Sequence, residues 1–203
     1  MPALRVYYNR PDLPPDASRG RPLVIGVDEV GRGSLAGPVA VCAVLVPDDF
    51  FLDGASESKR VSAAKRAALY DALPHQVRRY AIVTASPHHI DQVNIRNATL
   101  EAMALAVSRL RHDHCFPAMI DGNACPLGLS NAECIVGGDA LFPAIGMASI
   151  IAKVYRDRLM ALLSNAYPAY GWDRNSGYGT KEHYMALSLV GASPIHRSSF
   201  RLF

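Results

Sequence analysis

Short β-branched runs and helically spaced apolar residues follow one another along this chain, which predicts a domain that mixes strands with helices. The strand-like runs lie at 23–27, 39–46, 80–85, 118–120 and 133–136. Only a short segment with Gly37-Pro38 separates the first two runs, so we expect them to pair as a hairpin. Helices are predicted at 63–73, 87–92, 98–110, 143–163 and, after Thr180 as N-cap, at 181–189, whereas 165–179 is expected to be loop.

The chain of 203 residues is predicted to form one α/β domain over residues 21–203. We expect a mixed sheet flanked by helices, with a small helical part toward the C-terminus. Residues 1–20 include four prolines among polar residues and are predicted to be a loose lead-in. No internal repeat, low-complexity tract or linker divides the rest of the sequence.

The composition is that of an ordinary globular protein, with 50% hydrophobic and 19% charged residues. The four cysteines are Cys42, Cys115, Cys125 and Cys134, and no two of them form a C-x-x-C pair. Zinc ligation and a disulfide framework are therefore not expected, and reduced thiols in a cytoplasmic protein are the simpler interpretation. No apolar stretch approaches the ~18 residues of a membrane span, and no signal-peptide pattern is present.

Basic residues are concentrated toward the C-terminus. The chain carries a formal net charge of +3, and residues 151–203 contain 7 Lys/Arg against 3 Asp/Glu. A basic C-terminal quarter beside an acidic site suits a nucleic-acid substrate that is brought to metal-binding carboxylates. A solvated basic face without a partner is the alternative interpretation.

Four carboxylates occupy positions where strands end or a helix begins. Asp28 and Glu29 end one strand-like run, Asp121 follows another, and Asp139 lies between two glycines and the longest predicted helix. If the strands share a sheet, these acids converge and repel one another unless cations neutralise them, and hard oxygen ligands favour Mg²⁺ or Mn²⁺. Each acid alone could instead be a turn or capping residue. Asp28 and Glu29 would both face one site only if the strand bends there.

Gly31-Arg32-Gly33 follows the first two acids and combines backbone that a ligand can approach with a guanidinium suited to phosphate. With Ala36 it also matches the loose form of the dinucleotide fingerprint, G-x-G-x-x-A. That interpretation requires a helix to begin at the glycines, whereas the chain continues into a β-branched run. Two carboxylates directly upstream would also repel a pyrophosphate. We therefore expect a substrate-contacting loop and no dinucleotide site.

At this point the sequence resembles the type 2 ribonuclease H family (RNase HII). The family's opening signature is similar to residues 26–33, GVDEVGRG, and to the following LAGPV at 35–39. Further similar segments follow in the family's order: ESK at 57–59, DGN at 121–123, GDA at 138–140, ASIIAKV at 148–154, GYGT at 177–180 and SPIHRSSF at 193–200. The resemblance spans about residues 23–201, and the ordered set is far more specific than any single motif.

The resemblance implies a ribonuclease-H-like fold and an endonuclease that cuts the RNA strand of RNA/DNA hybrids. It also implies incision of duplex DNA on the 5′ side of a single embedded ribonucleotide, as in ribonucleotide removal from DNA, leaving a 3′-hydroxyl and a 5′-phosphate. The family's catalytic, metal-binding acids fall on Asp28, Glu29, Asp121 and Asp139, with two Mg²⁺ or Mn²⁺ ions in the active complex. The implied protein is a cytoplasmic monomer with no membrane partner.

By the same resemblance, backbone groups of Gly31-Arg32-Gly33 would sense the 2′-hydroxyl, which is the feature that separates RNA from DNA. Tyr178 would pack against the sugar of the next, deoxy, nucleotide. An added 2′-hydroxyl would crowd the ring there, which would select RNA-to-DNA junctions.

Several basic or polar side chains are candidates for phosphate contacts, and a solvated surface charge is the alternative role for the basic ones. They are Ser58, Lys59, Lys153, Arg156, Lys181 and Arg197. His183 and His196 are candidate proton carriers, with capping or packing as the alternative role. No nucleophilic Ser or Cys constellation is evident, so hydrolysis by direct attack of water is expected.

Two other functional classes fit parts of the pattern. A non-catalytic hybrid-binding protein would gain from losing the negative charge of the four acids, which this chain retains. A metal-dependent nuclease of other specificity, such as a DNA-junction resolvase, would not need the Gly31-Arg32-Gly33 loop together with Tyr178. Removing 2′-hydroxyls from the substrate discriminates between these classes, because only the ribonuclease depends on them.

Overall fold

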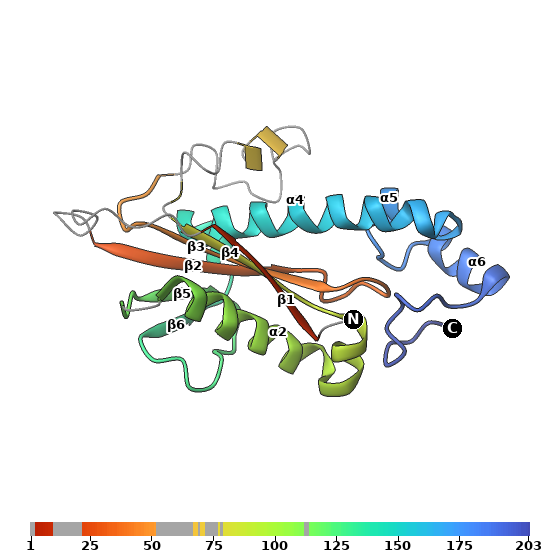
Figure 1. Cartoon of the computed structure of the whole chain (residues 1–203), viewed down its shortest axis with the longest axis horizontal. Helices are drawn as coiled ribbons and strands as arrows, with labels where there is room; N and C mark the ends of the chain where they lie inside the picture. Colours follow the sequence, from red (N-terminus) through yellow and green to blue (C-terminus); the bar gives the residue numbers. More distant parts are fainter. Residues whose placement is uncertain are drawn as a thin grey trace.

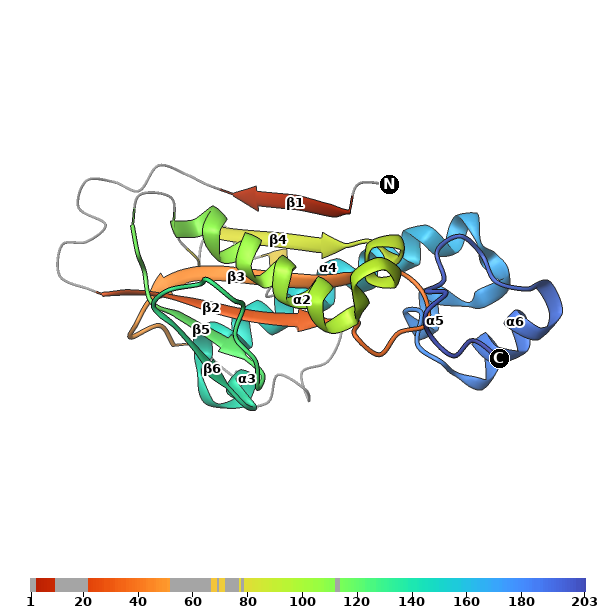
Figure 2. The same cartoon turned by 90° about the horizontal axis from the view of Figure 1, so that it is seen from below.

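A six-stranded mixed sheet organises the fold, in the order β1-β4-β3-β2-β5-β6 (Figure 2). The computed structural model describes residues 3–9, 22–51, 67–68, 70–71, 77, 79–111 and 114–203. The strands are β1 (Leu4–Asn9), β2 (Leu23–Val30), β3 (Val39–Pro47), β4 (Arg79–Ala85), β5 (Ala118–Asp121) and β6 (Ala132–Ile135). β2, β3, β4 and β1 pair antiparallel, whereas β5 runs parallel to β2 and β6 parallel to β5. β2 and β5 therefore end at the same edge of the sheet.

Two long helices cover the two faces of the sheet (Figure 1). α4 (Pro143–Ala166) lies on one face, and α2 (Pro87–Arg111), which is kinked at Asn94, lies on the other. Successive residues of β2 alternate between them: Val24 belongs to the core shared with α4, and Ile25 to the core shared with α2. Burial on both faces explains why β2 and β3 are apolar along nearly their whole length.

The C-terminal part of the chain forms a small helical unit beyond one end of the sheet (Figures 1 and 2). Its helices are the 3₁₀ helix η2 (Pro168–Tyr170), α5 (Trp172–Asn175) and α6 (Lys181–Val190). The apolar core of this unit contains the fully buried Trp172 and takes in Met160 of α4. Leu35 and Ala36, from the loop between β2 and β3, lie in the same core. The C-terminal unit therefore packs against the loop that carries the glycines.

The predicted α/β class is confirmed, and most elements form where the apolar pattern predicts them. β2 and β3 make the expected hairpin, and the Thr180 side chain caps α6 by accepting the His183 N–H. The helices expected at 87–92 and 98–110 join into α2. Most of the helix expected at 63–73 lies outside the described residues. In the part of the chain that the structure describes, no helix has the length and apolar character to cross a bilayer.

Three expectations are wrong. Residues 4–9, expected within a loose lead-in, form edge strand β1 on β4, because Leu4 and Val6 pack against the core on alternate positions. The segment 165–179, expected to be loop, contains η2 and α5. Cys125 and Cys134, expected as free thiols, form a disulfide, because the connection from β5 to β6 folds back and brings their Cα atoms within 5.6 Å.

Candidate active site

β2 and β5 bring two of the predicted acids side by side. The parallel ladder pairs Val27 with Ile120, and Asp28 and Asp121 are the next residues on the two strands. Neighbouring strands lie about 4.8 Å apart. The backbone alone therefore places these two carboxylates next to each other at the edge of the sheet.

Asp28 is a buried carboxylic acid, only 6% exposed. It accepts the Glu29 N–H at 2.7 Å and a hydrogen bond from Ser149 of α4. Burial raises the pKa of Asp28 to about 8, with the Ser149 hydrogen bond opposing the rise and the charges of Glu29 and Asp121 adding to it. The hydrogen bonds to Asp28 therefore do not compensate for burying its negative charge.

Glu29 lines a small cavity on the α2 side of the sheet. Arg32, Arg96 of α2 and Asp121 line the same cavity, and Glu29 Oε1 lies 3.3 Å from Arg32 Nη1. Burial raises the pKa of Glu29, and the charge of Arg32 opposes the rise. Regular pairing of β2 with β3 continues through Val30, so the strand does not bend between the two acids. They face opposite sides of the strand, and the charge of Asp121 acts on both of them.

Asp139 reaches this region through a short helix. α3 (Gly138–Leu141) begins where the Gly138 N–H donates to Asp121 Oδ1 at 2.7 Å. Asp139 is the next residue and is 5% exposed. The hydrogen bond from its neighbour thus places the Asp139 backbone beside Asp121.

The donor chemistry of this region suits a divalent cation. Within the described residues, no three His, Cys, Asp or Glu side chains are gathered into a closed ligand set. Mg²⁺ seldom needs one, because it binds through one or two carboxylates together with waters and substrate phosphates. Adjacent hard oxygen donors on Asp28 and Asp121, and the raised pKa of Asp28, fit such an open site.

Residues 31–38, here named the glycine loop, connect β2 to β3. Gly31 has a φ of 91° and is buried, and a Cβ there would collide with the Arg156 guanidinium, so only glycine fits. Arg32 and Gly33 are exposed. Because the loop leads into strand β3 and not into a helix, the structure confirms that the dinucleotide interpretation does not apply.

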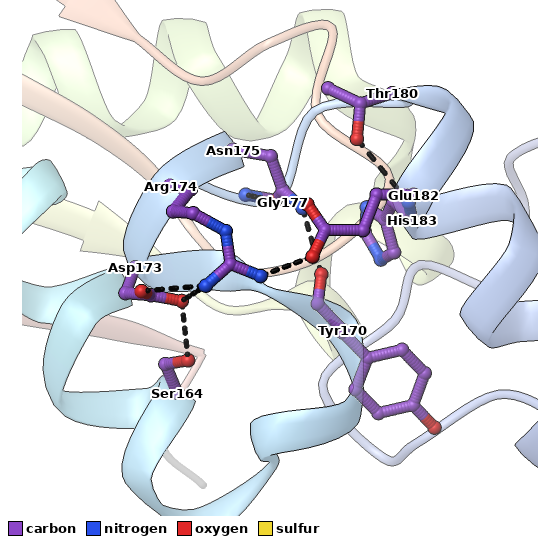
Figure 3. Close-up of polar contacts among 9 residues, drawn as sticks. All are labelled: Ser164, Tyr170, Asp173, Arg174, Asn175, Gly177, Thr180, Glu182 and His183. Carbon is purple, nitrogen blue, oxygen red and sulfur yellow. Dashed lines mark hydrogen bonds and ion pairs between the residues drawn. The ribbon is translucent and has the colours of Figure 1, made fainter.

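Tyr178 is presented by residues 176–180, here named the Tyr178 turn, between α5 and α6. The buried Asn175 organises this turn, since its Nδ2 donates to the Tyr170 carbonyl at 2.7 Å and its Oδ1 accepts the Gly177 N–H at 2.8 Å (Figure 3). Gly177 has a φ of 80° and lies so close to Ala36 that a Cβ would sit 2.6 Å from the Ala36 carbonyl oxygen. The Tyr178 turn and the glycine loop are therefore in direct contact.

An exposed group of charges links the elements around this turn (Figure 3). Arg174 pairs with Asp173 and with Glu182 of α6. Asp173 Oδ1 in turn accepts the Ser164 hydroxyl of α4 at 3.1 Å. Exposed pairs contribute little singly, so the stabilising value of this group lies in joining α4, α5 and α6 as a network.

His183 and His196 form a buried pair whose hydrogen bonds assign both rings as neutral. His196 Nδ1 accepts the Ser193 N–H at 2.9 Å, so its proton is on Nε2, 3.0 Å from His183 Nε2. His183 Nε2 also accepts the Trp172 N–H, and its Nδ1–H donates to the Tyr178 carbonyl at 3.0 Å. The geometry favours the packing role over the proton-carrier role, and it ties the Tyr178 turn to the C-terminal core.

We expect this pair to make the fold sensitive to acid. Burial lowers the pKa of His183, and burial with the neighbouring His183 lowers the pKa of His196 to about 4, below the ordinary 6.5. The neutral histidine pair contributes its full stabilisation of the fold above pH 6.5. This contribution is lost as the pH falls from 6.5 toward 4, because the unfolded chain binds protons that the fold excludes. Relative to His196→Gln, which does not titrate, the free energy of unfolding should fall by about 1 kcal/mol per pH unit. Urea unfolding at several pH values tests this, and equal slopes in both proteins would contradict it.

The remaining predicted substrate contacts are spread more widely. Lys153 pairs with Asp157 at 2.8 Å, and its Nζ lies 6.0 Å from the centre of the Tyr178 ring. Lys181 is exposed at the first residue of α6. Ser58 and Lys59 lie outside the described residues.

Three arginines at the site depart from the sequence analysis. Arg156 and Arg197, candidates for phosphate contacts with a surface charge as the alternative role, are instead fully buried. Arg96, which sequence analysis missed, lines the cavity with Glu29 and Asp121. Arg96 belongs to no recognisable motif. The only signal in the sequence is its helical spacing with Thr99 and Met103, which line the same cavity.

Comparison with known proteins bears on the family and the fold. A family model described as Ribonuclease HII matches residues 25–203. The Ribonuclease HII of Burkholderia vietnamiensis is 47% identical over 185 residues, which cover 91% of this chain and 85% of the relative. The crystal structure of the ribonuclease H2 from Pyrococcus horikoshii OT3 has a TM-score of 0.73 at 24% identity, covering 89% of this chain and 94% of that one. Bst-RNase HIII in complex with Mn²⁺ has a TM-score of 0.69 at 18% identity, covering 90% and 68%. The structural neighbours confirm the ribonuclease-H-like fold.

Proposed function

The chain belongs to the ribonuclease HII family, endonucleases that hydrolyse the RNA strand of RNA/DNA hybrids, and we propose that it also incises duplex DNA on the 5′ side of a single embedded ribonucleotide. The product would carry a 3′-hydroxyl and a 5′-phosphate. One observation carries the proposal: the glycine loop, which directly follows the acids of β2, touches the Tyr178 turn at Ala36 and Gly177. Two neighbouring sugars could thus be contacted beside the acidic site.

Asp28, Glu29, Asp121 and Asp139 are the proposed catalytic residues and ligands, with two Mg²⁺ or Mn²⁺ ions in the active complex. Such ions, when bound, neutralise the phosphodiester and lower the pKa of the attacking water. Asp28 is oriented for ligation by the Glu29 N–H and by Ser149. The Mn²⁺ complex of Bst-RNase HIII, a neighbour in fold, is consistent with this class of ion.

Recognition of the ribonucleotide is assigned to two adjacent elements. Backbone groups of Gly31, Arg32 and Gly33 would bind the 2′-hydroxyl, which both donates and accepts hydrogen bonds. The Tyr178 ring would lie against the following sugar, where a deoxy position leaves it room.

Phosphate contacts are proposed for Ser58, Lys59, Lys153 and Lys181, and the structure adds Arg96 as a cation in the cavity beside Asp121. The retained acids argue against a non-catalytic hybrid binder, because they repel the phosphate backbone. We further propose that the enzyme acts as a monomer in the cytoplasm.

Cleavage of matched labelled duplexes tests the proposal. We define the junction ratio as kcat/KM for a DNA duplex with one ribonucleotide divided by kcat/KM for a uniform RNA/DNA hybrid, both with Mg²⁺ or Mn²⁺. Tyr178→Ala should lower this ratio about tenfold, whereas Tyr178→Phe, which keeps the ring, should leave it within about twofold. An all-DNA duplex is the control.

Absence of cutting at the single ribonucleotide, or cutting on its 3′ side, would overturn the proposal. Cutting of the all-DNA duplex at a similar rate would instead favour a nuclease of other specificity. Binding of the hybrid with no metal-dependent cutting of any substrate would favour the hybrid binder.

A further inference from the structure

Two arginines hold the glycine loop from behind. Arg156 of α4 and Arg197 of the C-terminal segment are both 0% exposed. Burying a charged side chain is costly unless its donors are satisfied by hydrogen bonds. In both residues Nε and the two terminal nitrogens donate to backbone carbonyls. Since a guanidinium is a rigid planar fork, each arginine holds three carbonyls in fixed relative positions.

The side-chain hydrogen bonds of Arg197 all go to the glycine loop. Its Nη2 donates to the Gly31 carbonyl at 2.6 Å, its Nη1 to the Arg32 carbonyl at 2.8 Å, and its Nε to the Gly37 carbonyl at 3.0 Å. The neighbouring Ser198 is tied to Asp91 of α2 by its N–H and its hydroxyl, at 2.9 and 2.8 Å. Arg197 therefore supports the shape of the loop from an anchored segment.

Arg156 differs because it spans two elements. Its Nε donates to the Pro38 carbonyl at 2.9 Å and its Nη2 to the Ala36 carbonyl at 3.1 Å, both in the glycine loop. Its Nη1 donates to the Ser176 carbonyl at 2.7 Å, in the Tyr178 turn. The guanidinium carbon also lies 5.6 Å from the centre of the Tyr178 ring, within the range of a cation–π contact. One planar group thus fixes the loop, the turn and the ring relative to one another.

We propose that Arg156 is a positioning residue that sets the spacing between the glycine loop and Tyr178, and through it the preference for RNA-to-DNA junctions. This inference rests on the proposed function, because it requires the loop and the ring to contact adjacent sugars. Recognition of a junction depends on the distance between two contacts, so displacing one relative to the other weakens it even where each is intact. Arg156 lies behind both elements and needs no contact with the substrate.

Arg156→Lys tests the proposal, since lysine keeps the charge and the stem but loses the fork that joins carbonyls of two segments. We expect its junction ratio to fall about tenfold, because small displacements at a site have large effects on rate. Arg197→Lys is the matched variant with the same burial and the same loop but no bond to the Tyr178 turn. It should lower both kcat/KM values by similar factors and leave the ratio within about twofold. Arg158→Lys, an exposed neighbour on α4, should change neither rate.

A double variant shows whether Arg156 acts through the ring. Combined with Tyr178→Ala, Arg156→Lys should lower the ratio no further than Tyr178→Ala does alone. Both rates come from one preparation, so the ratio does not depend on the fraction of folded protein. Arg156→Gln, which leaves a shorter neutral donor, gives the same comparison if the lysine variant is not obtained folded.

The failure of this inference can be told apart from the failure of the proposed function. Absence of cutting at the single ribonucleotide would overturn the proposed function, and the inference with it. A wild-type ratio no higher than that of Tyr178→Ala would overturn the proposed role of Tyr178 and the inference, but not the incision itself. A high wild-type ratio that Arg156→Lys and Arg156→Gln both retain would overturn only the inference. Equal falls in the ratio for Arg156→Lys and Arg197→Lys would also overturn it, because the contact with the Tyr178 turn would then be irrelevant.

Discussion

Asp28→Asn is expected to abolish cleavage and, in the absence of divalent ions, to make the protein more stable. Asparagine keeps the acceptor for the Glu29 N–H but carries no charge to hold a cation, so activity should fall by at least about 10³-fold. The pKa of Asp28 is raised from its ordinary 3.8 to about 8, chiefly by burial. Between about pH 4 and pH 8 the fold therefore keeps Asp28 protonated while the unfolded chain ionises it, and the cost to stability grows as the pH rises. Removing the ionisable group should raise the free energy of unfolding at pH 7 by up to about 4 kcal/mol.

Urea unfolding in EDTA at pH 7 and pH 5, beside cleavage assays with Mg²⁺, measures both effects. The stability gain should be smaller at pH 5, where less of the Asp28 charge has to be suppressed. Glu133→Gln neutralises an exposed carboxylate on β6 and should change neither stability nor activity appreciably. A loss of stability in Asp28→Asn would show that the carboxylate is satisfied within the fold without a cation. Retention of more than about a tenth of the activity would remove Asp28 from the proposed ligands.

The central sheet was predictable because its strands are buried on both faces. Continuous apolar runs at β2 and β3, broken by Gly37-Pro38, leave little alternative to a hairpin. The edge strand β1 was not predictable, since it pairs on one side only and its short alternation stands beside a proline-rich stretch. The disulfide was missed for a related reason, because the fold of the connection from β5 to β6 decides which cysteines meet.

That Asp28 and Asp121 lie side by side was predictable, because each follows an apolar run in its own strand. The relative faces of Asp28 and Glu29 were not, because they depend on β2 running straight through both residues. The burial of Arg156 and Arg197 was not predicted, because a charged side chain is by default a surface residue. Their acceptors are carbonyls distant in sequence, 118 residues away for the Arg156 bond to Pro38, and backbone acceptors leave no trace in side-chain patterns. The sequence therefore locates the candidate acids better than it locates the buried arginines around them.

Gly26→Ala is expected to be the most destabilising single-methyl change in the sheet. At an open strand position alanine is more favourable than glycine by about 0.5 kcal/mol, so the simple expectation is a small gain. Here a Cβ would collide with the Ala144 carbonyl group and lie 2.6 Å from the Ile145 nitrogen. These are backbone atoms of the first turn of α4, and they can yield only if the helix moves away from β2. We therefore expect a loss of about 3 kcal/mol in the free energy of unfolding.

The same displacement should reach the active site, because Asp28 lies two residues along β2 and is held by Ser149 of the same helix. Cleavage by the folded Gly26→Ala protein should therefore fall on every substrate, with the junction ratio unchanged. Gly33→Ala is the control for stability, since a Cβ at Gly33 meets no atom within 4 Å. Urea unfolding of the wild type, Gly26→Ala and Gly33→Ala measures the differences in stability. A Gly26→Ala protein as stable as the wild type would mean that α4 is not held against β2 by close backbone contact. The positioning of Asp28 by Ser149 of α4 would then need another explanation.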